Sequence, residues 1–418
     1  MRYVRNGLPR DSDHRIPGKE RRQEMKKRPG FGTLTVHAGE EDRSGYHPSS
    51  MPLYQSSTFF FGDTQSGVDI LEGRKEGYIY TRIGNPTVRA FEDKIKALEG
   101  TEAAVAFASG MAAIAAVLLE LLRPGDEVIS CRQVYGGTTA FYENILTRLN
   151  CPVHYFHPQE DPDEKLTAVV SKRTKLIFFE TPTNPELSIV DMARIAALAK
   201  GHKIMSVIDN TFATPYLQRP LASGIDCVVH SATKYIGGHG DAIGGVVAGS
   251  RRFVTRLRQS MLLSHGACLS PFNAWLFLRG LRTLHVRMDR HCGTAAALAG
   301  FLEGHTRVRS VLYPGLKTHP GHATAKKQMS DFGGMVAFRL ADRKACRRFI
   351  DRLKLCRTGV SLGDTETIML HPANLFYPKL SDAECLRKGV DPLLIRISTG
   401  LEDAEDILAD IEQALKTL

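Results

Sequence analysis

One lysine, Lys234, stands among residue types that suit covalent chemistry with an aldehyde. The hydroxyls of Ser231 and Thr233 precede it, and a glycine-rich turn at residues 237–240 follows it. Hydroxyls can hold a phosphate, and glycines let the backbone approach a planar ligand closely. A partly desolvated amine loses its proton and attacks a carbonyl carbon. The segment therefore predicts Lys234 as the Schiff-base residue of a pyridoxal 5′-phosphate (PLP) site, whereas a lone lysine is otherwise most often exposed.

A second group of residues suits the phosphate of such a ligand. Ser109, Gly110 and Met111 precede an apolar stretch, residues 112–119, that predicts a buried helix. Backbone N–H groups at a helix N-terminus attract anions. The alternative is an ordinary helix cap, which a Ser-Gly pair also suits. The chain has no nucleotide-binding P-loop pattern.

Two residues suit the ring of the ligand. Asp209 ends a short apolar stretch, and a carboxylate there can keep a pyridine nitrogen protonated, which makes the ring an electron sink. Tyr135 stands beside two glycines, where an aromatic ring can stack on a flat ligand. The alternatives are a loop-capping aspartate and a half-buried core tyrosine.

Two arginines suit anionic groups. Arg82 lies two residues after Tyr80 on a segment that we expect to be extended, so both side chains project to one side and can grip a phosphate. A solvated surface pair is the alternative. Arg396 interrupts an apolar strand, where an unpaired cation is costly to bury. Either a substrate α-carboxylate or an internal Asp or Glu would pair with it.

The elements that must position these residues follow a βαβ rhythm. Between residues 85 and 280, apolar helical stretches alternate with short β-branched strands, which predicts a mostly parallel sheet. Residues 175–180 and 205–209 are two such strands. Ligands of open α/β sheets bind beyond the carboxyl ends of the strands, so we expect the chemistry at residues 180–185 and 209–211.

The chain changes character from about residue 281. A helical stretch at 291–301, a strand at 334–340 and an amphipathic helix at 403–418 predict a smaller α+β domain. The other end is basic, since residues 1–28 carry +6 of the formal net charge of +10. We expect this tail to be disordered and residues 1–24 to be dispensable. The remaining charge gives no support for a nucleic-acid-binding body.

Composition limits the class of protein. The 418 residues are 43% hydrophobic and 24% charged, as in globular proteins, and we find no signal peptide or membrane-spanning run. The eight cysteines form no C-x-x-C pair, which predicts reduced, separately packed thiols, a cytoplasmic location and no metal site. His319 and His322 flank a Pro-Gly pair and predict a loop.

Together these motifs resemble the Cys/Met-metabolism family of PLP enzymes, whose members include methionine γ-lyase, cystathionine γ-lyase, cystathionine γ-synthase and O-acylhomoserine sulfhydrylase. The resemblance runs from about Phe31 to the C-terminus. The motifs that carry it stand in family order: Tyr-Thr-Arg-Ile-Gly-Asn-Pro-Thr, Ala-Ser-Gly-Met, Glu-Thr-Pro-Thr-Asn-Pro, Ile-Asp-Asn-Thr, Ser-Ala-Thr-Lys-Tyr, Ser-Leu-Gly-Asp-Thr-Glu-Thr and Arg-Ile-Ser-Thr-Gly-Leu-Glu-Asp.

The resemblance implies an α/β fold of the fold-type I PLP-dependent transferase architecture. It divides the chain into a basic tail (1–30), an N-terminal arm that serves a neighbouring subunit's site (31–84), a large PLP-binding domain with a mostly parallel sheet (85–280) and a small α+β C-terminal domain (281–418). It also implies a homo-oligomer, a tetramer built from dimers that share their active sites. Neither a nucleic acid nor a membrane is expected as a partner.

The resemblance also assigns roles. Lys234 becomes the Schiff-base residue and catalytic base, Asp209 the partner of the pyridine nitrogen, and Tyr135 the stacking ring that assists departure of the leaving group. The phosphate contacts would come from Gly110, Met111, Ser231 and Thr233, joined by Tyr80 and Arg82 of the adjacent subunit. Asn184, Ser361 and Arg396 would hold the substrate carboxylate and the cofactor edge.

The implied activity is γ-elimination on L-methionine or a related sulfur amino acid, giving a thiol, 2-oxobutanoate and ammonia. Apolar Ile79 and Val360 flank the expected distal pocket, where cystathionine-cleaving relatives often place acidic residues, and this favours a short thioether. Gly137 stands where methionine γ-lyases typically present a cysteine, and residues 243–245 resemble the sulfhydrylases. Cystathionine γ-lyase or γ-synthase, O-acetylhomoserine sulfhydrylase and a non-catalytic relative therefore stay as alternatives.

Overall fold

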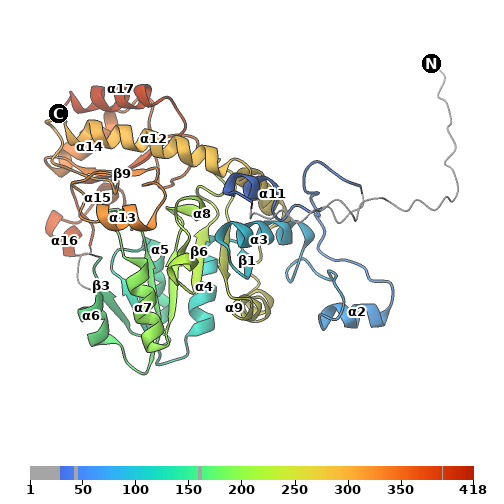
Figure 1. Cartoon of the computed structure of the whole chain (residues 1–418). Helices are drawn as coiled ribbons and strands as arrows, with labels where there is room; N and C mark the ends of the chain where they lie inside the picture. The colour runs from blue at the N-terminus through green and yellow to red at the C-terminus, as the bar shows by residue number, and fades with distance from the viewer. Residues whose placement is uncertain (1–28, 42–45, 159–161, 388) are drawn as a thin grey trace, which may run out of the picture.

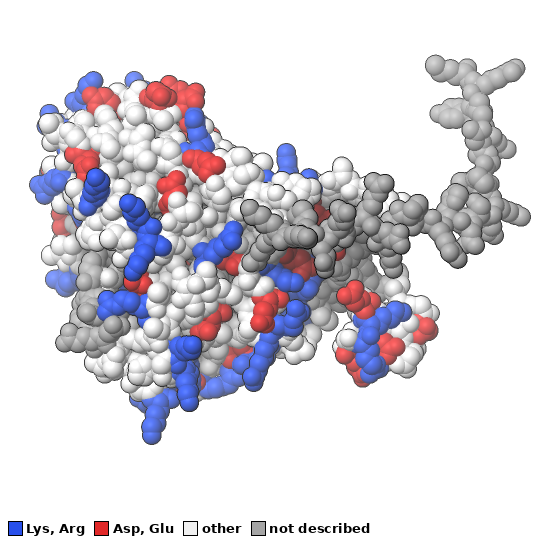
Figure 2. Space-filling view, viewed as in Figure 1, with Lys and Arg blue, Asp and Glu red and all other residues white. Residues whose placement is uncertain are grey.

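The computed structural model describes residues 29–41, 46–158, 162–387 and 389–418 (Figure 1). The predictions for residues 1–28, that they are disordered and in part dispensable, lie outside these residues. On the face in Figure 2, lysines and arginines are interspersed with acidic residues over the body. This mixture matches the expectation that the body itself carries little excess charge.

A seven-stranded sheet forms the centre of the fold. Its strands are β1 (Ala103–Phe107), β2 (Glu127–Cys131), β3 (Val153–Phe156), β4 (Thr174–Glu180), β5 (Met205–Asp209), β6 (Cys227–Ser231) and β7 (Gly245–Gly249). They lie in the order β1-β7-β6-β5-β4-β2-β3. Only β7 runs against its neighbours β1 and β6, and the pairs from β6 to β3 are parallel. The predicted mostly parallel sheet is confirmed.

Helices cover both faces of this sheet. They are α3 (Pro86–Glu99), α4 (Gly110–Leu121), α5 (Gly136–Phe141), η1 (Tyr142–Leu146), α6 (Pro162–Val169), α7 (Met192–His202), α8 (Thr214–Leu217), η2 (Pro220–Ser223), α9 (Arg251–Leu257), η3 (Arg258–Leu262), α10 (Leu263–His265) and α11 (Pro271–Leu281). Successive side chains of a strand point to opposite faces of the sheet, so each strand contributes to the core on both faces. Val105 and Phe107 of β1 pack in the cluster that contains α4 and α9, whereas Ala104 and Ala106 pack with α3 and α11.

A second sheet of five strands lies towards the C-terminus, at the other end of the molecule from α2 (Thr64–Leu71) (Figure 1). Its strands are β8 (Ser310–Leu312), β9 (Met335–Arg339), β10 (Arg357–Thr358), β11 (Ile368–Leu370) and β12 (Leu394–Ser398). Its helices are α12 (Leu284–Glu303), α13 (His322–Gln328), α14 (Arg343–Arg352), α15 (Pro372–Phe376), α16 (Asp382–Arg387) and α17 (Ala404–Leu415). The predicted elements at 291–301, 334–340 and 403–418 correspond to α12, β9 and α17, and α12 is longer than expected. The predicted loop between His319 and His322 is confirmed, since Pro320 and Gly321 form a turn and His322 is the first residue of α13.

The N-terminal arm is anchored to the body by a buried ion pair. Its first helix, α1 (Phe31–His37), precedes Glu40, whose carboxylate contacts both Lys94 of α3 and Arg282. The Lys94 side chain is fully buried and also donates to the Thr35 carbonyl at 2.8 Å. Although burial alone raises it, the hydrogen bonds from Arg282 and Lys94 hold the pKa of Glu40 below its ordinary value. The charge of Glu40 therefore stabilises the attachment of the arm.

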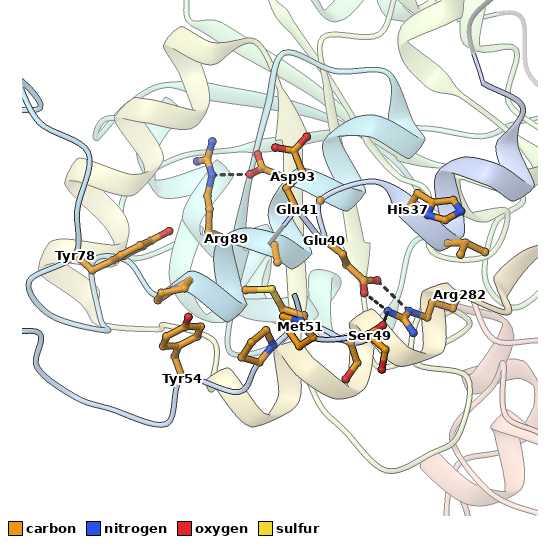
Figure 3. A pocket seen from close by; sticks show the side chains of 17 residues that line it. His37, Glu40, Glu41, Ser49, Met51, Tyr54, Tyr78, Arg89, Asp93 and Arg282 are labelled. Atoms are coloured by element: carbon orange, nitrogen blue, oxygen red, sulfur yellow. Dashed lines mark hydrogen bonds and ion pairs between the residues drawn. The ribbon is translucent and has the colours of Figure 1, made fainter. Parts of the chain in front are cut away.

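A cavity of about 210 Å³ lies beside this ion pair, between the arm and α3. Figure 3 shows Glu40 pointing towards Arg282 at one end of the cavity and Arg89 paired with Asp93 at the other. None of the residues predicted to bind the cofactor or the substrate lines it. The cavity therefore lies where the arm contacts the body and is not part of the candidate site.

We expect Glu40→Gln to lower the free energy of unfolding by about 3 kcal/mol, because it leaves the buried Lys94 ammonium without its carboxylate. The pKa of Glu40 is lowered on folding, so its contribution is full above the ordinary value of 4.5 and is lost as the pH falls through the folded-state pKa. Urea unfolding at pH 7 and at pH 3.5 checks both points. A variant that loses as much stability at pH 3.5 as at pH 7 would contradict this assignment.

Candidate active site

Lys234 lies in the turn after β6, within reach of the second sheet. Its Nζ donates to Ser361 Oγ at 3.0 Å, and Ser361 stands between β10 and β11. Burial lowers the pKa of Lys234, and the positive charge of Arg396 lowers it further, against a smaller opposing effect of Asp364. The neutral amine, which is the form that attacks a carbonyl or accepts a proton, is therefore more accessible here than on an exposed lysine.

Arg396 lies on β12, 4% exposed, and no Asp or Glu of the described residues pairs with it. Its Nη1 donates to Asn184 Oδ1 and its Nη2 to the Ser361 carbonyl, both at 3.0 Å. Its Nε is buried and has no hydrogen-bond partner among the described residues. Burial lowers the pKa of Arg396 to about 10. A guanidinium offers five N–H groups, so this cation retains donors for a carboxylate ligand.

Two carboxylates stand side by side at the carboxyl ends of β4 and β5, Glu180 buried and Asp209 partly exposed. Glu180 and Asp209 pair in register. Glu180 Oε1 accepts from the Tyr135 N–H at 2.6 Å, and Asp209 Oδ1 accepts from the Thr211 N–H at 3.0 Å. Burial raises the pKa of both groups, and the charge of Asp209 raises that of Glu180 further. A ligand that brings a positive charge, such as a protonated pyridine nitrogen, compensates this arrangement.

The N-terminus of α4 and the end of β6 meet at a glycine. A Cβ on Gly110 would lie 2.8 Å from the Cβ of Ser231, so only glycine fits. Ser109 caps α4 by accepting from the Ala112 N–H at 3.0 Å, as the capping alternative proposed. The Thr211 hydroxyl accepts from the Ser231 N–H at 2.8 Å. The expected phosphate contacts Gly110 and Ser231 are thus adjacent and linked through Thr211 to Asp209.

Thr233 is placed differently from these contacts. Its hydroxyl donates to the Gly244 carbonyl at 3.2 Å and accepts from the Gly244 N–H at 3.1 Å. A hydroxyl has a single O–H to donate. Thr233 must therefore release the Gly244 carbonyl before it can donate to a phosphate, and its contribution stays a prediction.

Tyr135 stands at the start of α5 and is 48% exposed, so about half of its surface is free to contact a ligand. Its ring lies over Gly137, where an added Cβ would be 2.4 Å from Tyr135 Cε1 and 3.0 Å from Met111 Sδ. Met111 follows Gly110 at the start of α4. Because Gly137 has no side chain, the Tyr135 ring and the Met111 side chain can both lie against it.

We expect Gly137→Ala to reduce kcat/KM about tenfold, because the added methyl displaces the Tyr135 ring at an overpacking cost of about 1–3 kcal/mol. Steady-state kinetics with L-methionine check this. Gly136→Ala is the matched control, since a Cβ at that neighbouring position meets nothing within 4 Å. Equal kinetics for the two variants would remove the role assigned to Gly137.

Tyr80 and Arg82 do not join the residues around Lys234 in the described chain. The expectation of an extended segment is wrong at Arg82, because the N–H groups of Ile83 and Gly84 bond the Tyr80 carbonyl and form a turn. Their two side chains still meet, since the Arg82 guanidinium lies 5.5 Å from the centre of the Tyr80 ring. Arg82 Nη1 donates to the Leu263 carbonyl at 2.5 Å.

Three residues of the site were missed at the level of sequence. Glu180 and Thr211 lie in the two segments that were expected to bind the ligand, but neither was given a role. Arg287 of α12 donates to the carbonyls of Tyr235 and Gly280, both at 2.8 Å, and so braces the turn after Lys234. Nothing in the sequence distinguishes Arg287 from Arg290, the other arginine of α12, because the partners of Arg287 are backbone atoms.

The residues brought together fit PLP. An amine faces a hydroxyl and a cation, a partly buried carboxylate suits a ring nitrogen, an exposed aromatic side chain can stack, and a glycine at a helix N-terminus leaves room for a phosphate. Among the described residues, no group of three or more His, Cys, Asp or Glu side chains is placed to hold a metal ion. Within the same part of the chain, no helix is long and apolar enough to cross a membrane.

Comparison with known proteins agrees with this fit. The model of the family described as Cys/Met metabolism PLP-dependent enzyme matches residues 32–416. An L-methionine gamma-lyase of Fusobacterium nucleatum subsp. nucleatum is 43% identical over 94% of this chain and 100% of its own. An O-succinylhomoserine sulfhydrylase of Pseudomonas aeruginosa is 41% identical over 93% of this chain and 96% of its own.

A solved structure extends the comparison to the fold. It is an O-acetylhomoserine (thiol)-lyase of Campylobacter jejuni, which is 32% identical and superposes with a TM-score of 0.88. The match covers 93% of this chain and 100% of that one. The C. jejuni protein carries a lysine modified with pyridoxyl phosphate.

Proposed function

Because the chain belongs to the Cys/Met metabolism family of PLP-dependent enzymes, we propose that it is a PLP-dependent carbon–sulfur lyase of the methionine γ-lyase type. It releases a thiol from L-methionine or a related thioether and forms 2-oxobutanoate and ammonia. Similarity to an L-methionine gamma-lyase along nearly the whole chain supports this choice. The observation that carries it is the approach of the Lys234 amine to Ser361 and to Arg396, a buried cation with unused donors.

Bound PLP supplies an electron sink for the charge that forms at the substrate Cα. Arg396 and Asn184 bind the substrate carboxylate, and Ser361 orients Nζ of Lys234. Burial and the charge of Arg396 lower the pKa of Lys234, so its neutral Nζ would be able to take the Cα proton of the bound substrate. A second proton would have to leave Cβ before the sulfur departs from Cγ, and Tyr135 would assist that departure.

The cofactor itself would be held by residues of five segments of the chain. In this proposal Asp209 would pair with the ring nitrogen, Tyr135 would stack on the ring, and Lys234 would supply the amine that reacts with the aldehyde. The phosphate would be bound by Gly110, Met111, Ser231 and Thr233 of one subunit, and by Tyr80 and Arg82 of its neighbour.

Product analysis distinguishes the candidate activities. The enzyme is incubated with methionine, cystathionine or O-acetylhomoserine, each with and without sulfide, and 2-oxobutanoate, ammonia and homocysteine are measured. We expect 2-oxobutanoate from methionine without sulfide. Homocysteine from O-acetylhomoserine and sulfide, with methionine inert, would instead assign γ-replacement, which the 41% identical sulfhydrylase favours.

We propose that the active enzyme is a homo-oligomer, a tetramer built from two dimers, and that the two subunits of each dimer share their active sites. The arm supports this proposal, because α2 lies on a loop that extends away from the body (Figure 1). Phe60 beside it is 99% exposed, and Leu71 and Tyr46 are 68% and 89% exposed. Large exposed apolar side chains on a projecting segment are typical of subunit contacts. The eight free thiols support a cytoplasmic location.

Shared sites make a complementation experiment decisive. Lys234→Ala and Arg82→Ala each inactivate every site of their own oligomer, but a hybrid dimer contains one site with both substitutions and one with neither. Unfolding and refolding the two variants together is expected to restore roughly a quarter of the wild-type activity. If the mixture stays as inactive as either variant while hybrid dimers are detected, Arg82 does not serve a neighbouring site.

A further inference from the structure

The residues of the site lie on one face of the strand ends. Asp209 pairs in register with Glu180 on β4 and with Val229 on β6, so these three side chains point to the same side of the sheet. Ser231, two residues after Val229, points there too. α4 lies on this side of the sheet, because Gly110, its first residue, lies against Ser231.

The neighbouring residues point to the opposite face, towards α3. His230 pairs in register with Val246, which belongs to the core cluster of α3 and α11. Asn210 follows Asp209 and hydrogen-bonds to Glu99 at the end of α3. His230 and Asn210 are each one residue away from a residue of the site, and neither has a role in the proposed reaction.

A buried hydrogen-bond network joins these residues. His230 Nε2 and Glu99 Oε1 are 2.5 Å apart, and Asn210 Nδ2 donates to the same oxygen at 3.4 Å. Gln218 Nε2 donates to Asn210 Oδ1 at 2.9 Å and to the Thr181 carbonyl, next to Glu180, at 3.0 Å. The network therefore connects the ends of β4, β5 and β6 behind the site.

The network is polar, buried and incompletely satisfied. Glu99 and Gln218 are each 2% exposed, and His230 is fully buried. Glu99 Oε2 and His230 Nδ1 have no hydrogen-bond partner among the described residues. Burying such atoms is costly, and apolar residues of similar size would avoid the cost. Polar residues are explained here if their hydrogen bonds are needed to hold the strand ends in a fixed arrangement.

We propose that Glu99, His230 and Gln218 are positioning residues for the cofactor site, which fix from the far face of the sheet the strand ends that carry Asp209 and Ser231. The proposal rests on the assignment of Asp209 and Ser231 to PLP made above.

The test measures PLP binding and the pH titration of the visible absorbance of the bound cofactor, using the full chain. Glu99→Ala and Gln218→Leu interrupt the network at its two ends. Each is expected to raise the dissociation constant of PLP about tenfold, because the partners left unpaired no longer fix the strand ends that carry Asp209 and Ser231. Each should also shift the absorbance titration, since Asp209 is no longer fixed. Glu99→Gln keeps a hydrogen-bonding side chain of the same size and is expected to restore both quantities.

Asp410→Asn is the matched control for a general loss of stability. Asp410 of α17 is also a buried carboxylate, 6% exposed, and accepts from the N–H groups of Lys354, Leu355 and Cys356, far from the strand ends in sequence. We expect it to lower the melting temperature without changing either readout.

The outcomes separate this proposal from the proposed function. If wild-type protein binds no PLP, the proposed function fails. If wild type binds PLP and the two network variants bind it equally well with an unchanged titration, the positioning role is overturned. The role is also overturned if Asp410→Asn shifts both readouts as much as Glu99→Ala does, or if Glu99→Gln behaves like Glu99→Ala.

Discussion

Replacing Lys234 with alanine is expected to reduce turnover by roughly ten-thousandfold or more, the largest effect of any single substitution in this chain. The variant loses both the amine that bonds the cofactor and the base that takes the Cα proton, and such a group alone contributes about 10²–10⁴-fold. Losses of this size are found when a nucleophile is removed. Initial rates with L-methionine and mass spectrometry after borohydride reduction measure the two losses separately.

Lys200→Ala is the control, because Lys200 is exposed on α7. It should keep wild-type turnover, and the reduced protein should carry the pyridoxyl group on the Lys234 peptide. A pyridoxyl group that stays attached to the Lys234→Ala variant, or one found on another side chain of the wild type, would falsify the central assignment.

Replacing Arg396 with lysine is expected to lower kcat/KM about 100-fold, mostly through KM. Lysine keeps the charge but loses the planar fork, so it cannot bond Asn184, the Ser361 carbonyl and a carboxylate together. Each charge-assisted hydrogen bond is worth about 1.5–3 kcal/mol. Its loss weakens binding of the carboxylate equally in the ground state and in the transition state, so the effect is on KM. Steady-state kinetics measure kcat and KM, and cofactor absorbance shows that PLP is still bound.

Arg279→Lys is the control for arginine replacement as such, since Arg279 is exposed on α11. It should leave both constants unchanged. A fall in kcat of Arg396→Lys with KM unchanged contradicts carboxylate binding and would indicate that Arg396 acts on Lys234 instead.

The candidate residues that the sequence singled out are those whose own residue type indicates a chemistry. A lysine between hydroxyls and glycines, a carboxylate ending a strand and an arginine inside an apolar strand are each unusual locally. The parallel strands were predictable for the same reason, because their β-branched residues lie between helical stretches.

The residues that were missed act through contacts that only the folded chain creates. His230 and Glu99 are distant in sequence and meet because α3 lies over the end of β6. Arg287 bonds backbone carbonyls, which every residue offers. The turn at Arg82 depends on the Tyr80 carbonyl accepting two N–H groups, a backbone arrangement that side-chain spacing does not reveal.

The strand order also determines when the protein becomes competent during synthesis. Ala103 of β1 pairs with Gly249 of β7, and β7 is the strand that links β1 to the remainder of the sheet. Contacts between residues so distant along the chain form late and slow the folding of a domain. A nascent chain that ends at α7 contains Gly110, the first residue of α4, but lacks Ser231, which lies against that glycine in the folded protein. The expected phosphate site is therefore incomplete until the chain has been synthesised past β6.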